Sequence, residues 1–419
     1  MKAIKHLALL LLFGCAAIGA AAQNGTMSPY SNFGYGLLRD HTTGAQRSMG
    51  GVGYAMNSGR QINAMNPASY AVIDTLTFIF DMGVDFTYLT QSEIQNGANV
   101  KENNFGGGLD YANMQFPLGK YMGGSVGLLP FSSVGYSFGS SIDNGAASYQ
   151  GDGSINQLYI GVAGRPFKGF SIGANISYLF GNVINDVYGY VNSGSSTSLF
   201  QTQLEVRDYY LDFGAQYSFN PMPNNRATLG LTYAPSKTLH GHARQFAYDA
   251  SVDTEPSFSD EHKLSDGYFL PESWGAGISW EWDRKLFAEF DFTYQPWSKA
   301  RFRGFADDPT VHEFANRTKY ALGAQYTPDF RGSYFKRMEY RLGGYYSNDY
   351  LVVNGNQLRE HGVSFGFGFP VPEYKTRINL GFEWKHRQGH PNALIKENYF
   401  SVTLGINFCE TWFFQRKIR

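Results

Sequence analysis

Residues 78–88 read FIFDMGVDFTY, and in this stretch every second side chain is large and apolar. The positions between them carry Ile79, Asp81, Gly83, Asp85 and Thr87, most of them small or acidic. A period of two residues predicts a β-strand with one apolar and one polar face. The apolar face consists of Phe78, Phe80, Met82, Val84, Phe86 and Tyr88.

The same alternation returns at residues 288–295, 377–384 and 400–408. Many runs exceed ten residues, whereas strands of soluble proteins usually have about 5–6. A strand that crosses a membrane needs about 9–11 residues, with its apolar side chains facing the lipid. Aromatic residues make up 16% of the chain and charged residues also 16%, with 49 glycines. This composition favours a membrane barrel, with a soluble β-sandwich or propeller as the alternative.

The links between the apolar runs alternate in length. Short, proline-containing links occur at 116–119, 165–168, 220–224 and 370–372, whereas long polar links span 91–104, 140–153, 182–201 and 240–268. Short inner turns and long outer loops are typical of outer-membrane barrels. The sequence therefore predicts an all-β fold: a transmembrane antiparallel β-barrel of about fourteen strands over residues 76–419. Its location would be the outer membrane of a Gram-negative bacterium.

Residues 1–22 have the organisation of a signal peptide. Lys2 and Lys5 precede an apolar core from Leu7 to Phe13, and three alanines precede Gln23. The apolar core is too short for a membrane-spanning helix. Leu12 to Cys15 loosely resembles a lipid-attachment site, which makes a lipoprotein one alternative. A retained membrane anchor is the other.

Residues 23–75 lack a strand period but carry many apolar side chains among glycines. Fourteen strands enclose a lumen that side chains alone do not fill, since about eight strands are the limit. We therefore expect this segment to be a hatch, or plug, inside the barrel; a disordered periplasmic extension is the alternative. Asn66-Pro67-Ala68 ends the hatch, because proline fixes its own φ and disfavours helical angles at Asn66. Side chains expected to line the hatch or a ligand pocket are Phe33, Tyr35, Met49, Tyr54 and Met65.

An N-terminal hatch that ends in Asn66-Pro67-Ala68 and precedes about fourteen strands resembles the FadL/TodX family of outer-membrane transporters. The resemblance covers the chain from about Ser28 to its end. It implies uptake of hydrophobic small molecules such as long-chain fatty acids. In that mechanism the ligand passes a pocket beside the hatch and leaves laterally through the barrel wall, with outer-membrane lipids as neighbours.

Two features depart from this pattern. The link 240–268 is rich in acidic residues, serine and histidine, and the inward face is heavily charged. Paired charges are ordinary in a plugged lumen. Glu289 and Glu383, on the inward face, are expected to accept small polar replacements more readily than the lipid-facing Phe292, Leu380 and Leu404 accept arginine. The alternative function is a non-transporting scaffold subunit of an outer-membrane secretion or assembly complex, with a protein partner. The inward charges are Asp208, Asp212, Glu281, Glu289, Asp291, Lys319, Glu339, Arg341, Arg377 and Glu383.

The sequence carries no catalytic motif, and we expect no enzyme activity and no cofactor. His240 and His242 could meet His262 in the longest link, but a solvated polar loop explains them better than a metal site. The formal net charge is −1 and no basic run occurs, which argues against nucleic-acid binding. Only Cys409 would remain after removal of the signal peptide, which excludes a disulfide framework.

Overall fold

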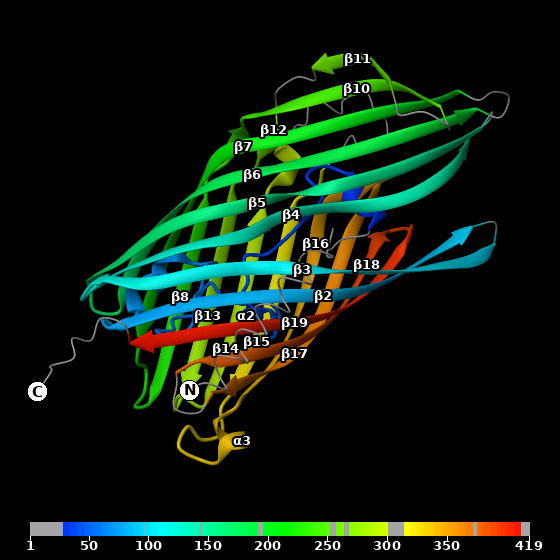
Figure 1. Cartoon of the computed structure of the whole chain (residues 1–419). Coiled ribbons are helices and arrows are strands. Elements are labelled where there is room, and N and C mark those ends of the chain that lie inside the picture. Colours follow the sequence, from blue (N-terminus) through cyan, green and yellow to red (C-terminus); the bar gives the residue numbers. More distant parts are fainter. Residues whose placement is uncertain are drawn as a thin grey trace, which may run out of the picture.

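The computed structural model describes residues 28–95, 97–142, 145–191, 196–251, 257–263, 268–300, 314–371 and 375–411. The expected signal peptide, with Cys15, lies outside these described residues. The described chain forms a closed, antiparallel β-barrel of fourteen strands with its N-terminal segment inside (Figure 1). The predicted fold class is therefore confirmed, and the chain is an outer-membrane β-barrel.

The barrel strands follow one another around the wall in chain order, and β19 pairs with β2 to close it. They are β2 (Thr77–Gln95), β3 (Ala98–Gly119), β4 (Met122–Ile142), β5 (Gly145–Phe167), β6 (Phe170–Val191), β7 (Ser196–Phe219), β8 (Asn225–Ala234), β13 (Ser273–Trp282), β14 (Leu286–Gln295), β15 (Arg317–Tyr326), β16 (Glu339–Val353), β17 (Asn356–Pro370), β18 (Arg377–His390) and β19 (Lys396–Thr411).

The alternation along β2 is as the sequence predicts. Asp81 and Asp85 face the lumen and are buried, whereas Tyr88 on the opposite face is 46% exposed. Across the closing pair, Val84 lies opposite Leu404 and Phe80 opposite Phe408, so apolar side chains adjoin on the outer face. An apolar outer surface matches the hydrocarbon that surrounds it.

The wall is much taller on one side than on the other. Strand β7 has 24 residues, whereas β8, β13, β14 and β15 have ten each. At about 3.3 Å per residue and a tilt of about 40°, β7 rises roughly 60 Å, far more than an apolar band of about 25 Å. The hairpins β2–β3, β4–β5 and β6–β7 therefore project beyond the membrane, and we call their distal ends the wing (Figure 1).

The wing corrects the expectation of long outer loops. The links expected at 91–104, 140–153 and 182–201 are mostly strand, because their backbones continue the ladders of their hairpins. The expected loop 240–268 contains β10 (Gly241–Ser251) and β11 (Ser257–Lys263), and β10 pairs with the distal half of β7. Strands β9 (Lys237–Leu239) and β12 (Tyr268–Leu270) form a separate two-stranded ribbon. Polar composition was compatible with strand here because neither face touches lipid.

The hatch segment contains four short elements, drawn in blue inside the barrel in Figure 1. They are the 3₁₀ helix η1 (Pro29–Asn32), strand β1 (Leu37–Leu38), helix α2 (Gly44–Arg47) and the 3₁₀ helix η2 (Pro67–Val72). The remaining short helices are η3 (Trp297–Lys299) and α3 (Tyr334–Arg337), both in connections between barrel strands. No helix among the described residues is long and apolar enough to cross a membrane.

The ladder between β3 and β4 is incomplete. These strands pair only from Ala112, opposite Leu128, to Gly119, opposite Met122, although both continue far into the wing. Figure 1 shows the two ribbons separating toward their hairpin ends. Strand β1 of the hatch pairs instead with the freed edge of β4, with Leu37 opposite Ser133. Strand β1 of the hatch thus forms part of the backbone pairing that β4 does not make with β3.

Candidate functional site between the hatch and the barrel wall

Two buried carboxylates on β14 bind the backbone of the hatch. Asp291 Oδ2 accepts hydrogen bonds from the N–H groups of Gly53 (2.7 Å) and Tyr54 (3.0 Å). Glu289 Oε1 accepts one from the N–H of Ala55 (2.6 Å). Each bond gives a partner to a backbone N–H group that would otherwise be buried without one, which is costly in a folded protein. Glu289 thus contacts the hatch directly, and its tolerance of small polar replacements stays a prediction.

Asn66 organises the end of the hatch. Its backbone is extended (φ −134°, ψ 105°), as expected before proline, and its side chain accepts a hydrogen bond from the N–H of Ala68. The same side chain donates to the carbonyl of Tyr54 over 2.7 Å. The chain does not turn directly into the first strand, because η2 intervenes. The motif therefore caps a 3₁₀ helix and ties it to a second hatch loop.

The barrel wall carries glycines where this motif packs against it. A Cβ atom at Gly214 would overlap the side-chain oxygen of Asn66, and one at Gly230 would overlap the carbonyl oxygen of Tyr54. Glycine allows a close backbone approach that every other residue blocks. The hatch therefore packs directly on the strand backbones of β7 and β8, and no room remains for a ligand at these points.

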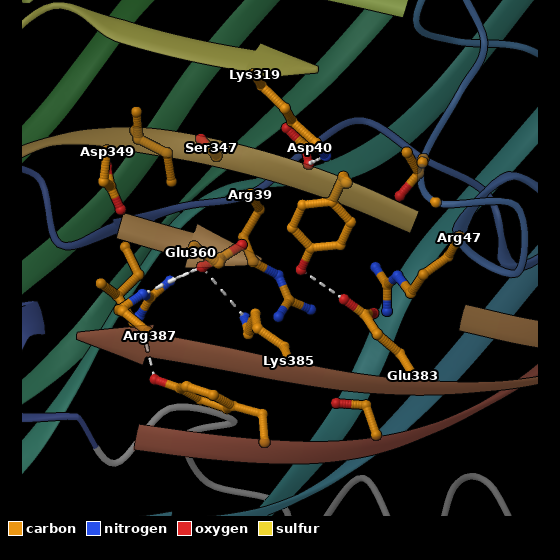
Figure 2. Close-up of a pocket in the computed structure, with 18 of the residues that line it drawn as sticks. Arg39, Asp40, Arg47, Lys319, Ser347, Asp349, Glu360, Glu383, Lys385 and Arg387 are labelled. Atoms are coloured by element: carbon orange, nitrogen blue, oxygen red, sulfur yellow. Dashed lines mark hydrogen bonds and ion pairs between the residues drawn. The ribbon is translucent and has the colours of Figure 1, made fainter. Parts of the chain in front are cut away.

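A charged cavity of about 100 Å³ lies on the other side of the hatch (Figure 2). Asp40 of the hatch forms ion pairs with Lys319 (2.5 Å) and Arg317 (3.1 Å) of β15. On strands β17 and β18, Glu360 pairs with Arg387 over 2.6 Å. The ionisable side chains that line the cavity are Arg39, Asp40, Arg47, Asp85, Arg317, Lys319, Asp349, Glu360, Glu383, Lys385 and Arg387.

A second hatch ion cluster faces β3. Asp110, which is 2% exposed, pairs with Arg47 over 2.6 Å and with Arg39 over 2.9 Å. Together with the ion pairs of Asp40, these contacts tie residues 39–47 of the hatch to both β3 and β15 of the barrel. A buried ion pair is costly to break from one side, because the remaining charge is left without a partner.

The ion pairs also set the protonation of the hatch. Burial alone would raise the pKa of Asp40, but the attraction of Lys319 and Arg317 outweighs it and holds that pKa well below its ordinary value. Burial lowers the pKa of the adjacent His41 to about 4, so that this imidazole is neutral near pH 7. Asp40 in the charged cavity is thus ionised and paired, whereas the adjacent His41, which borders a separate cavity, is uncharged.

The residues predicted to line the hatch or a pocket lie in three separate places. Tyr35 and Phe33 belong to an aromatic cluster below the wing, where the ring centroids of Tyr35 and Trp297 are 6.0 Å apart. Met49 is buried against β15. Tyr54 and Met65 border a separate cavity of about 110 Å³. Trp297 contacts Tyr35 and also lines the cavity of Tyr54 and Met65, so two of these places adjoin; the role of the five residues in ligand binding stays a prediction.

Residues 3–419 match the BamG family, almost the whole length of the sequence. The chain belongs to the BamG family. No curated protein matches the sequence.

Solved structures share the barrel and hatch of this BamG-family chain. The TodX toluene transporter of Pseudomonas putida has a TM-score of 0.59 at 14% identity, with 90% of this chain and 99% of TodX covered. The TbuX toluene transporter of Ralstonia pickettii has a TM-score of 0.59 at 12% identity, covering 88% and 98%. A FadL homologue of Pseudomonas aeruginosa gives 0.59 at 11% identity, covering 89% and 99%. Identities this low establish the fold alone, so the predicted FadL/TodX-like fold is confirmed.

Sequence reasoning missed the charged residues of the BamG-family hatch. Arg39, Asp40 and Arg47 carry most of its ion pairs, but they sit in a segment without a period to place them. One signal was present: the inward face already showed buried charges such as Lys319, and a plug that fills such a lumen has to supply partners. As for metals, no group of three or more His, Cys, Asp or Glu in the described part of the chain is placed to hold an ion. The side chain of His262 lies outside the described residues.

Proposed function

We propose that this chain is a non-transporting FadL-like barrel that acts as a scaffold subunit of an outer-membrane assembly complex. Membership of the BamG family supports this function, since the family suggests partnership in such a complex. We assign residues 23–75 as the hatch and 76–419 as the barrel, and we assign no catalysis or cofactor to either.

The observation that carries the proposal is the character of the charged cavity that Asp40 and Lys319 border, between the hatch and the wall. Ligand pockets for small molecules usually have about 300–1,000 Å³ and mostly apolar walls. Here the cavity has about 100 Å³ and is lined by six basic and five acidic side chains. A hydrophobic molecule that entered it would strip water from these charges without replacing the lost hydrogen bonds. A cavity lined in this way fits a hatch that stays fixed better than a passage for hydrophobic molecules.

The wing supports the same function. Its hairpins continue β2 to β7 well past the height that a membrane requires, and β10–β11 extends the sheet further. Wing positions such as Lys101, Glu102 and Asn103 are polar on both faces, whereas a capture surface for hydrophobic molecules would be apolar. The wing also exposes single apolar side chains such as Ile94 and Phe105, and a sheet of this mixed character outside the membrane suits the docking of a protein.

Uptake of hydrophobic small molecules is the second candidate function. It is favoured by the incomplete β3–β4 ladder and by a third cavity whose lining includes Met65, Phe131 and Trp297. That cavity has only about 110 Å³ and also contains Arg39, Asp40 and Arg317. Uptake requires the hatch to leave its ion pairs, whereas a scaffold requires that it keep them.

Purification from native membranes separates the two functions. The tagged full-length chain is extracted in mild detergent, and the co-purifying proteins and extracted lipids are quantified by mass spectrometry. A scaffold gives defined protein partners in fixed ratio to the chain and no enriched apolar ligand. A monomeric protein that carries stoichiometric acyl chains or another apolar compound would overturn the proposal. An unrelated outer-membrane barrel with the same tag controls for nonspecific proteins and lipids.

A further inference from the structure

A large cavity opens at the end of the barrel that carries the short turns, which is the periplasmic end. It has about 830 Å³, and hatch residues including Asn57, Ser58 and Gln61 form its floor. We call this cavity the vestibule. It shares no lining residue with the charged cavity described above.

The vestibule has a strong excess of basic side chains. The chain as a whole has a net charge of −1, so the excess is a local property of this end. Three acidic side chains line it: Asp74, Glu281 and Glu339. Seven basic side chains line it: Arg60, Arg165, Arg226, Arg284, Lys285, Arg331 and Arg377. A recess lined by one sign of charge concentrates groups of the opposite sign.

Some of these cations are engaged within the wall. Arg226 pairs with Glu281, and Arg377 Nε lies 3.1 Å from Glu339. Arg60, Arg284 and Arg331 are exposed and have no acidic partner among the described residues. They come from the hatch, the β13–β14 turn and the β15–β16 connection, respectively. Three cations on three elements thus surround one opening.

The turn that carries Arg284 keeps this cation at a conformational cost. Asp283 (φ 49°) and Arg284 (φ 55°) both have left-handed backbones, and Lys285 donates a hydrogen bond to the carbonyl of Trp282. A tight turn of this type favours Asn or Gly at its two central positions. An arginine there is strained relative to glycine, so turn formation alone does not explain its presence.

We infer that the vestibule binds an acidic, extended segment of a periplasmic protein partner; this inference rests on the proposed scaffold function. Cations spread over three elements suit a chain with several carboxylates better than one compact anion. Membrane lipids lie outside the barrel wall, so their headgroups do not face a recess within the lumen. The carboxylates of a segment that enters the vestibule pair with its exposed arginines. These contacts hold the partner protein at the periplasmic face of the membrane.

Fluorescence anisotropy of the full-length protein in detergent tests this inference. The probe is a fluorescein-labelled peptide of alternating Asp and Gly, and a Lys–Gly peptide is its counterpart. We expect the acidic probe to bind, and the affinity to fall as ionic strength rises from about 0.1 M to about 1 M, where the screening length shortens from about 10 Å to about 3 Å. The variant Arg60→Gln/Arg284→Gln/Arg331→Gln should bind about tenfold more weakly, as expected for the loss of three exposed ion pairs.

The matched control removes the same charge from the opposite end. Lys101→Gln/Lys299→Gln/Lys396→Gln changes three side chains near the wing and should leave probe binding unchanged. Equal binding by all three proteins, or a preference for the Lys–Gly peptide, would overturn the inference. Displacement of the probe by an equal concentration of inorganic phosphate would also overturn it, because the site would then recognise a small anion. Heat-modifiable gel migration verifies that each variant is folded.

Native purification distinguishes this failure from failure of the proposed function. If the wild-type chain has no partner in fixed ratio, the scaffold function fails whatever the probe does. If a complex is present and the vestibule variant retains both probe binding and every periplasmic partner, only the vestibule inference fails. Loss of one periplasmic partner in the vestibule variant, with the complex intact in the wing control, supports it.

Discussion

The backbone N–H of Ala55 donates a 2.6 Å hydrogen bond to Oε1 of Glu289, which joins the hatch to the barrel wall across 234 positions of sequence. Both groups are buried, so water does not replace the bond when it is lost. Asp291 binds the two preceding N–H groups in the same way. The acidic side chains of β14 therefore bind the hatch rather than merely fill the lumen.

The variant Glu289→Ala should loosen the hatch without unfolding the barrel. An N–H group left unpaired in a buried place costs about 1–3 kcal/mol. We expect faster hydrogen exchange at residues 53–55 and larger single-channel conductance in planar bilayers. Glu205→Ala is the control, because Glu205 pairs with the exposed Arg207 on the wing and surface pairs contribute about 0–1 kcal/mol. Equal effects of both variants would contradict this role of Glu289.

Gly230 should tolerate no side chain. A Cβ atom there overlaps the carbonyl oxygen of Tyr54, so Gly230→Ala has to displace the hatch from β8. Overpacking of this kind costs about 1–3 kcal/mol. Gly119→Ala is the control, because nothing lies within 4 Å of a Cβ at that position. We expect a lower unfolding temperature and higher conductance for Gly230→Ala alone; similar values for both variants would show that the hatch adapts.

Asp40 should make the hatch sensitive to acid. The ion pairs with Lys319 and Arg317 hold its pKa below the ordinary value of 3.8, so the folded state binds this proton less readily than the unfolded state. The stabilisation is therefore complete above the ordinary pKa and is lost as pH falls through the folded pKa. Conductance and hydrogen exchange at residues 37–43 should rise at low pH in the wild type. In Asp40→Asn they should be raised at every pH, and an acid transition that persists in that variant would assign it to another group.

The period of two residues was enough to predict the barrel, because lipid on one side and a lumen on the other impose the alternation directly. Residues 78–88 show this plainly, and the proline-marked turns placed the periplasmic ends. The wing was misread as loops because its strands, such as those around Lys101 and Asn103, lie in water on both faces. Polar composition then no longer separates strand from loop.

The hatch contacts were beyond the reach of the sequence for a different reason. Asp40, Arg47 and Asn66 meet partners between 63 and 279 positions away or on several strands at once. No local period encodes such pairings, which depend on how a loop winds inside a closed wall. The aromatic and methionine residues predicted to line the hatch or a pocket meet different parts of the wall, and hydrophobicity alone does not specify which part each side chain meets.

The outer face should reject charge at mid-strand. Leu380 lies on the lipid-facing side of β18, opposite Leu404 of β19. Arginine near the midplane of a membrane costs about 2–4 kcal/mol, so Leu380→Arg should lower the free energy of unfolding in lipid vesicles by that amount. Leu380→Met, which nearly conserves volume, should cost less than about 1.5 kcal/mol. Comparable losses for the two variants would mean that this face does not contact lipid.

A reversible lock between hatch and wall should decide whether the hatch moves during function. Leu37 of β1 and Ser133 of β4 are directly opposed in an antiparallel pair. Such pairs have Cα atoms about 4.5–5.5 Å apart, which a disulfide spans. In Leu37→Cys/Ser133→Cys, oxidation should join the two, while the native Cys409 is buried and remains apart.

If the chain is a scaffold, the oxidised lock should leave the native complex and the cellular levels of other outer-membrane proteins unchanged. If it is a transporter, the lock should abolish uptake of a labelled long-chain fatty acid, and a reducing agent should restore it. The single variants Leu37→Cys and Ser133→Cys control for the substitutions themselves. Loss of uptake that follows oxidation and reverses on reduction would contradict a fixed hatch, because ion pairs such as Asp40–Lys319 would then have to break in every transport cycle.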